Sequence, residues 1–166
     1  VYIADRDNNR VRRVDLAGVI TTIAGTGGAG SSGDGGPATA AQVRAPRDLA
    51  FDQAGGLLIA EAESNRVRRV DPDGTITTFA GTGVWGYTGD GGPATSAAIS
   101  EPNGVTVDPL GRVLVTSGGE IRRIDGDGVI TTIAAGLIGA SGVAVDRQGR
   151  ITVVESWGGQ VRRIDT

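Results

Sequence analysis

Hydrophobic and polar positions alternate along this chain in short runs of three to six residues, separated by glycine, aspartate and proline. The runs are rich in valine, isoleucine and threonine, as in Leu57–Ala60, Val113–Val115 and Ile151–Val154. This composition and spacing are typical of β-strands joined by tight turns. Because no window shows the spacing of apolar residues that a helix requires, the pattern predicts an all-β protein.

One block of sequence organises the whole chain. It occurs four times, at intervals of 56, 54 and 40 residues: Arg10–Asp15, Arg66–Asp71, Glu120–Asp125 and Gln160–Asp165. We interpret the shortest interval as the bare repeat unit. The two longer intervals contain an insertion, because Gly33–Thr39 (GDGGPAT) recurs at Gly89–Thr95.

Each unit is predicted to contain four strands, of which the recurring block is the third. In the second unit the strands are 48–52, 57–60, 66–71 and 75–80. The division of the chain follows as a partial unit at 1–25, units at 43–81 and 99–135, and a partial unit at 138–166. The chain is therefore expected to hold fourteen strands.

The third strand indicates how the units pack. In the first copy, Val11 and Val14 are three residues apart, so the pleat of a strand directs them to opposite faces of the sheet. Both faces then need apolar cover, which stacked propeller blades supply and a two-layer sandwich does not. The pattern predicts an all-β fold, a β-propeller of four-stranded antiparallel blades, and this chain would supply about 3.5 blades of a partial ring. Arginine stems would line the seams, with their guanidinium groups in water or paired with aspartate. We expect further blades, or other copies of the chain, to complete the ring.

Composition removes whole classes of chemistry. The chain has no Cys, Met or His, and its 16 basic residues are all arginine. Disulfides, thiolate nucleophiles, histidine-bound zinc, Ser-His triads and Schiff-base lysines are excluded. The net charge of −3 favours neither a polyanion nor an anionic membrane, and there is no apolar run long enough to span a bilayer. Because the chain begins inside a repeat, we expect it to be part of something larger, either a natural protein or an engineered propeller fragment.

Several motifs occur together: Val1–Asp5 (VYIAD), Asn9–Arg12 (NRVR), the Ile-Thr-Thr strands followed by Ala-Gly, and the GDGGPAT segments. In combination they resemble bacterial NHL-repeat β-propellers with GDGGPAT loops. The resemblance spans essentially the whole chain. It implies a non-catalytic binding or assembly scaffold of an exported or surface protein, with protein partners that include further copies or blades. Because family members also include lyase relatives, it leaves open a metal-dependent hydrolase or lyase of the lactonase-like propeller type.

Loops on one rim carry the candidate binding residues. The insertions 26–43 and 82–99 exceed ordinary connection lengths. Asp34 and Asp90 are candidates for contacts with a ligand or partner, and the alternative is that they accept backbone hydrogen bonds in a compact turn. Trp85, Tyr87 and Trp157 depart from the other copies of their segments, so they are also predicted to contact a ligand or partner. The alternative for Trp85 and Tyr87 is a small core beneath their loop.

Three acidic residues end second strands and could face the propeller axis. They are Asp5, Glu61 and Glu155, whereas Thr116 or Ser117 takes that place in the third unit. Carboxylates arranged in this way could bind a divalent metal such as calcium. We expect instead that these residues cap turns and that the protein has no cofactor, and the metal site is the alternative.

Nucleotide and nucleic-acid binding are not supported. Gly25–Gly30 and Gly81–Gly86 match G-x-G-x-x-G, but no helix follows either segment to face a pyrophosphate. The arginines follow the strand register and are interleaved with aspartate, as expected of an ion-paired blade surface.

Overall fold

The computed structural model describes residues 1–164, which form four antiparallel sheets that we number 1 to 4 in chain order. Asp165, the last residue of the fourth repeat block, lies outside the described residues. Sheet 1 contains β1 (Tyr2–Asp5), β2 (Arg10–Val14) and β3 (Ile20–Ala24); sheet 2 contains β4 (Pro46–Phe51), β5 (Leu57–Glu61), β6 (Arg66–Val70) and β7 (Ile76–Ala80). Sheet 3 contains β8 (Pro102–Val107), β9 (Val113–Ser117), β10 (Glu120–Ile124) and β11 (Ile130–Ala134); sheet 4 contains β12 (Ala140–Val145), β13 (Ile151–Glu155) and β14 (Gln160–Ile164). The remaining elements are single 3-10 turns, η1 (Arg6–Asn8), η2 (Ala38–Ala40), η3 (Ala62–Ser64) and η4 (Ala94–Ser96).

Aspartates shape the turn between the first and second strands of sheets 2, 3 and 4. Asp52 Oδ1 accepts hydrogen bonds from the backbone N–H groups of Ala54 and Gly56, at 2.9 and 2.8 Å. Asp108 and Asp146 make the same pair of bonds in sheets 3 and 4. A short acidic side chain stabilises such a turn because it satisfies two backbone donors that the turn leaves free. This explains why an aspartate recurs at this point of the repeat.

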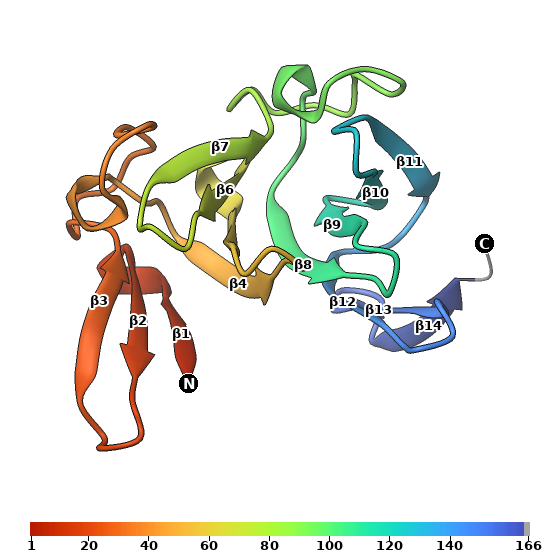
Figure 1. Ribbon diagram of the computed structural model, residues 1–166. Helices are drawn as coiled ribbons and strands as arrows, with labels where there is room; N and C mark the ends of the chain where they lie inside the picture. Colours follow the sequence, from red (N-terminus) through yellow and green to blue (C-terminus); the bar gives the residue numbers. More distant parts are fainter. Residues whose placement is uncertain (165–166) are drawn as a thin grey trace.

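The four sheets lie side by side along an open arc (Figure 1). The first strands of sheets 2, 3 and 4 lie together at the centre of the arc, where β8 contacts both β4 and β12. The prediction of an all-β fold built from small antiparallel sheets is confirmed, and the arc is not closed. In residues 1–164, no helix has the length and apolar character that crossing a membrane demands.

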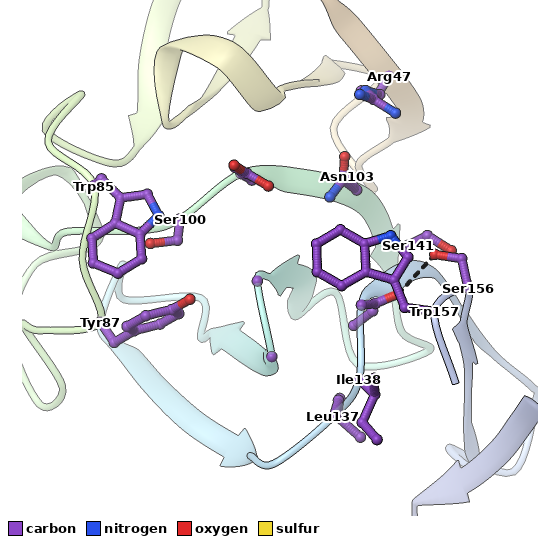
Figure 2. Close-up of a pocket in the computed structure, with 15 residues that line it drawn as sticks. Arg47, Trp85, Tyr87, Ser100, Asn103, Leu137, Ile138, Ser141, Ser156 and Trp157 are labelled. Atoms are coloured by element: carbon purple, nitrogen blue, oxygen red, sulfur yellow. Dashed lines mark hydrogen bonds between the residues drawn. The ribbon is translucent and has the colours of Figure 1, made fainter. Parts of the chain in front are cut away.

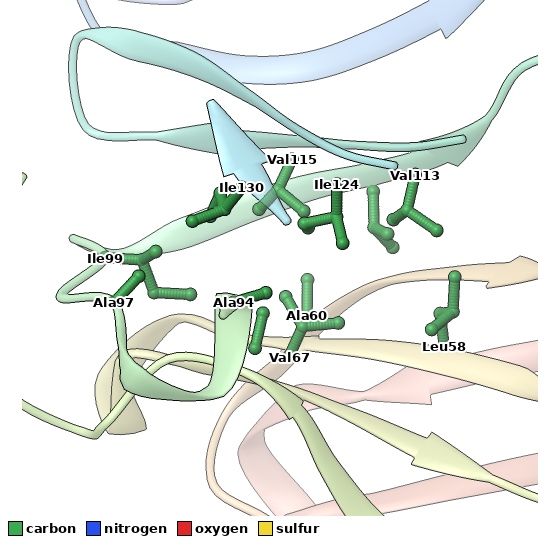
Figure 3. Close-up of a cluster of buried hydrophobic side chains, with 12 residues drawn as sticks. Leu58, Ala60, Val67, Ala94, Ala97, Ile99, Val113, Val115, Ile124 and Ile130 are labelled. Carbon is green, nitrogen blue, oxygen red and sulfur yellow. The ribbon is translucent and has the colours of Figure 1, made fainter. Parts of the chain in front are cut away.

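Apolar side chains fill the seams between neighbouring sheets. Between sheets 2 and 3, the cluster includes Leu58 and Val67 on one side and Val115 and Ile130 on the other (Figure 3). Val70 belongs to the separate cluster between sheets 1 and 2. Two valines of one strand therefore serve opposite seams, which confirms the prediction made from their spacing.

The two insertions brace the following sheet. Gly35 N donates to Ile76 O at 2.8 Å, and Ile76 N donates to Gly36 O at 3.0 Å. Pro37 forms an isolated bridge with Thr75, and Pro93 forms the matching bridge with Val129. The GDGGP segment thus pairs with the start of the outermost strand of the next sheet, which protects part of a strand edge that would otherwise be free.

A buried arginine lies under each insertion. The side chain of Arg68 on β6 is fully buried, where it forms an ion pair with Asp34 and lies 3.7 Å from the carboxylate of Glu61. Asp34 also accepts a hydrogen bond from the Thr78 hydroxyl at 2.7 Å. In sheet 3, Arg122 is equally buried and pairs with Asp90 at 2.7 Å. The predicted pairing of arginine with aspartate occurs here inside the seam.

Glu61 differs from the other acidic residues of this region because it is completely buried. Burial raises the pKa of Glu61 from 4.5 to about 7, against the opposing effects of the Ser64 hydroxyl and the Arg68 guanidinium. Glu61 Oε2 accepts a hydrogen bond from Ser64 at 2.8 Å, whereas the buried Oε1 has no hydrogen-bond partner. The carboxyl group is therefore held in a setting that disfavours its charge.

Candidate functional site

A pocket of about 580 Å³ opens at the centre of the arc, where the first strands of sheets 2, 3 and 4 converge (Figure 2). We call it the rim pocket. Its lining comes from β4, the insertion between β7 and β8, β8 itself, the β9–β10 turn, the β11–β12 connection, β12 and the β13–β14 turn. Segments far apart in the sequence therefore meet around one cavity.

Aromatic side chains lie on two sides of the rim pocket. Trp85 and Tyr87 pack edge to face on one side, with ring centres 5.3 Å apart, and Trp157 lies on the other side (Figure 2). Trp157 is 83% exposed and Trp85 is 61% exposed. Trp85 and Tyr87 contact each other but do not form a buried core beneath their loop, so the small-core alternative is not what the structure contains.

The insertion that carries Trp85 and Tyr87 is held from below. The buried Ser100 hydroxyl accepts a hydrogen bond from Gly86 N at 2.9 Å and donates one to Gly86 O at 3.0 Å. Ser100 N in turn donates to the Ser117 hydroxyl at 2.8 Å. Since Gly86 lies between the two aromatic residues, these bonds determine where both rings are placed.

Two glycines provide the space in which the aromatic rings rest. A Cβ atom at Gly118 would lie 2.3 Å from the Tyr87 hydroxyl oxygen, and one at Gly139 would lie 2.9 Å from Cγ of Trp157. Both glycines also have positive φ angles, of +58° and +69°. Larger residues would displace the rings and strain the backbone, so glycine is required at both places.

Polar side chains from three first strands face the same pocket. Arg47, Asn103 and Ser141 occupy matching positions, each at a break in register where the first strand pairs with the second. Within residues 1–164, the side chains of Arg47 and Asn103 have no hydrogen-bond or ion-pair partner, whereas Ser141 donates weakly to Val154 O at 3.4 Å. β-bulges often re-aim a side chain beside a functional site.

A strained residue adjoins this polar group. Glu101 has a φ of 42°, in the left-handed region that a residue with a side chain rarely adopts. Its backbone N–H donates to the Asn65 side-chain oxygen at 3.0 Å, which ties sheet 2 to the start of sheet 3. A second hollow of about 400 Å³ continues from the rim pocket and shares Arg47, Trp85, Glu101 and Asn103 with it.

Glu155 supports the far side of the rim pocket. Its side chain is fully buried, accepts a hydrogen bond from Ile138 N at 2.7 Å and pairs with Arg162 at 3.1 Å. The hydrogen bond from Ile138 and the nearby guanidinium hold the pKa of Glu155 below 4.5, although burial opposes them. Because Ile138 precedes Gly139, on which Trp157 rests, Glu155 positions the Trp157 side of the pocket.

This support leads to a prediction. We expect Glu155→Gln to accelerate hydrogen exchange of the 135–140 backbone at pH 7, because a neutral amide accepts the Ile138 bond less strongly. In the parent chain the stabilising effect of the carboxylate is present above pH 4.5 and is lost as the pH falls through the lowered pKa of Glu155. Exchange followed by mass spectrometry would measure both effects. Glu101→Gln is the control and should leave this segment unchanged; unaltered exchange in Glu155→Gln would contradict the assigned role.

Comparison with sequence families supports the repeat type. The family model of the teneurin NHL domain matches residues 85–136. Human teneurin-4 is 49% identical over 45 residues, which cover 27% of this chain and 2% of that protein. Chicken teneurin-1 is 42% identical over 57 residues, which cover 34% of this chain and 2% of that protein. The chain thus corresponds to a small part of these relatives, and the matches support an NHL-repeat family.

Solved structures with the same architecture decide the fold. Virginiamycin B lyase from Staphylococcus aureus superposes on 99% of this chain and 48% of its own, with a TM-score of 0.69 and 18% identity. The chain is an arc of a β-propeller. A nidogen–laminin complex matches this propeller arc over 98% of the chain and 55% of its own, with a TM-score of 0.70 and 17% identity. A gluconolactonase from Xanthomonas campestris superposes on 98% of this chain and 52% of its own, with a TM-score of 0.70 and 17% identity. The arc spans about half of the first of these structures, and identities at this level indicate fold alone.

The structure brings together some of the predicted site residues of the propeller arc. Trp85, Tyr87 and Trp157 all line the rim pocket. Asp34 and Asp90 do not line it, because their carboxylates contact Arg68 and Arg122 in the next sheet. The hydrogen-bond partners of both aspartates belong to that sheet and not to the turn that carries each aspartate.

The acidic residues proposed for a metal do not meet. Within residues 1–164, no group of three or more acidic side chains is arranged to hold a metal ion. Asp5 accepts a hydrogen bond from the Asn8 side chain at 2.8 Å, Glu61 from Ser64, and Glu155 from Ile138. Asp5 and Glu61 bond within their own turns, whereas Glu155 bonds to the connection that precedes its sheet.

The polar side of the pocket is not among the sites predicted from the sequence. Arg47 and Asn103 each follow a proline that starts a first strand, and the residue after this proline changes between copies while its surroundings persist. That variation was the available signal. The strand pairing also decides between Thr116 and Ser117: Ser117 pairs with Glu120 as Glu61 pairs with Arg66, so Ser117 takes the place of Glu61, although it lies closer to the block that follows. The cause is the shorter β9–β10 turn, which consists of Gly118 and Gly119.

Proposed function

We propose that this propeller arc is a non-catalytic binding module that holds a ligand or a segment of a partner protein in the rim pocket. The observation that carries the proposal is the convergence of exposed Trp85, Tyr87 and Trp157 on one cavity that also contains the unpaired side chains of Arg47 and Asn103. Exposed aromatic side chains at one place contribute little to folding, whereas they supply large contact areas and polar edges for binding. The pocket is also preformed, which reduces the ordering cost of association.

The subtype of the repeats belongs to the same proposal. Two intact GDGGPAT segments, at Gly33–Thr39 and Gly89–Thr95, support the bacterial type of NHL repeat. Among proteins of this architecture, one is named for a complex with laminin and others are named as a lyase and a gluconolactonase. A metal-dependent hydrolase or lyase is therefore the alternative that an experiment has to separate from a binding module.

A set of pocket variants tests the proposal. Trp85→Ala, Tyr87→Ala and Trp157→Ala should each change the free energy of unfolding by no more than about 0.5 kcal/mol, because their rings lie at the surface. Each should weaken binding at least about tenfold, as loss of a central aromatic contact does. Surface plasmon resonance against immobilised saccharides and proline-containing peptides would measure binding, with melting curves as the stability readout.

Val84→Ala is the matched control, since Val84 is 64% exposed in the same insertion but does not line the rim pocket. It should bind as the parent does. Absence of any binding that depends on the three aromatic residues would contradict the proposal. Calcium-dependent hydrolysis of δ-gluconolactone or a p-nitrophenyl ester by the same chain would instead establish the enzyme alternative.

A further inference from the structure

We infer that the rim pocket recognises a neutral oligosaccharide built of pyranose rings. This inference rests on the proposed binding function and specifies the class of ligand. Its first support is the aromatic lining: Trp85 with Tyr87 on one side and Trp157 on the other present exposed rings to the cavity (Figure 2). A pyranose ring has a flat face of C–H groups that packs on an aromatic ring while its hydroxyl groups remain free at the edge.

The charges of the lining favour a neutral ligand. Arg47 and Glu101 are the charged residues among those that line the rim pocket, so their formal charges cancel. Neither side chain has a hydrogen-bond or ion-pair partner within residues 1–164. A ligand of strong single charge would gain from one of these groups and be opposed by the other.

The donors and acceptors fit hydroxyl groups. The Arg47 guanidinium only donates, the Glu101 carboxylate only accepts, and the Asn103 amide does both. Sugar hydroxyls both donate and accept. Two adjacent hydroxyls can therefore form a pair of hydrogen bonds with the two neighbouring polar atoms of a guanidinium, carboxylate or amide group. Arg47, Asn103 and Ser141 come from three strands around a centre. A peptide that added to a sheet would instead need its donors and acceptors along one strand edge.

The size of the site favours more than one sugar ring. The rim pocket of about 580 Å³ lies within the range of ligand sites, which is roughly 300–1,000 Å³. The adjoining hollow of about 400 Å³ shares Arg47, Trp85 and Asn103 with it, so a chain of rings can extend from one hollow into the other. The two hydrogen bonds between Ser100 and Gly86, together with the glycines beneath Tyr87 and Trp157, hold the aromatic rings before a ligand arrives.

Titration with defined probes tests the inference. Maltotriose, cellotriose and fully N-acetylated chitotriose would be added to the parent chain, alongside trigalacturonate and a proline-rich decapeptide, with binding followed by tryptophan emission and calorimetry. We expect at least one neutral trisaccharide to bind, with little dependence on salt. Trp157→Ala and Asn103→Ala should each weaken that binding about tenfold or more, while Val84→Ala binds as the parent does.

The outcomes separate this inference from the proposed function. Peptide binding that depends on Trp85 and Trp157, without binding of any neutral saccharide, would overturn the saccharide inference and uphold the binding module. Tighter binding of trigalacturonate than of every neutral trisaccharide, weakened by added salt, would overturn ligand neutrality. Failure of all five probes would overturn the saccharide inference, and the immobilised panel described above would then decide the proposed function by itself.

Discussion

Replacing Asp34 with alanine is expected to lower the free energy of unfolding by about 3 kcal/mol at pH 5. The substitution leaves the guanidinium of Arg68 fully buried without its ion-pair partner. Removing one member of a buried pair costs about 3–5 kcal/mol, because the remaining charge keeps its desolvation penalty. The lower end applies because the Asp34 side chain is 45% exposed, so water can enter the space that it leaves.

The cost should depend on pH in a specific direction. Glu61 lies 3.7 Å from Arg68, and burial raises the pKa of Glu61 to about 7. At pH 8 the ionised Glu61 can compensate the unpaired guanidinium, so the loss caused by Asp34→Ala should be smaller there than at pH 5. Urea unfolding at the two pH values would measure this difference.

Two comparisons make the result decisive. Asp7→Ala removes an exposed partner of Arg6 and should change stability by less than about 0.5 kcal/mol. Asp90→Ala should cost less than Asp34→Ala, because Arg122 keeps bonds to the carbonyl groups of Thr88 and Ala98, whereas Arg68 keeps, within residues 1–164, a bond to the carbonyl group of Gln42 alone. Equal effects of Asp34→Ala and Asp7→Ala would show that the seam does not depend on the buried pair.

The second large effect is expected from Glu61→Gln, which should stabilise the chain by about 3 kcal/mol at pH 8 relative to the parent. The pKa of Glu61 is raised from 4.5 to about 7 on folding, so the native state holds a proton that the unfolded state has released between these values. The parent therefore loses stability as the pH rises from 4.5 toward 7. A glutamine cannot ionise, so the variant should lack this loss.

Unfolding free energies measured from pH 4.5 to pH 8 would show the divergence of the two curves. Ser64→Ala provides a variant with the opposite expectation. Its hydroxyl donates to Glu61 Oε2 and lowers the pKa of Glu61, so removing it should raise that pKa and enlarge the loss of stability by extending it to higher pH. Parallel curves for the parent and Glu61→Gln would refute a raised pKa in the folded chain.

These electrostatic effects belong to the scaffold, whereas binding belongs to the rim pocket. Arg68, Asp34 and Glu61 do not line the pocket, so their variants test the seam between sheets. Trp85, Tyr87 and Trp157 lie at the surface of that pocket, so their variants test binding with little effect on folding. The two sets of experiments can therefore be interpreted independently.

Much of the fold was determined by the sequence alone, because its signals are local and repeated. Strand composition and aspartate turns act over a few residues, and four copies of one block reveal the unit without knowledge of distant contacts. The three-residue separation of Val67 and Val70 was enough to assign them to opposite seams, since the pleat of a strand is a local property. The departures of Trp85, Tyr87 and Trp157 from their copies likewise marked half of the site.

Only the tertiary structure decided which side chains meet. Trp157 faces Trp85 because successive sheets are rotated about a common centre and because Gly118 and Gly139 leave room for the rings. The same rotation places Asp34 over Arg68 of the next sheet and keeps Asp5, Glu61 and Glu155 apart. Angles between sheets arise from packing summed over many side chains, and a repeat pattern in one dimension does not contain them.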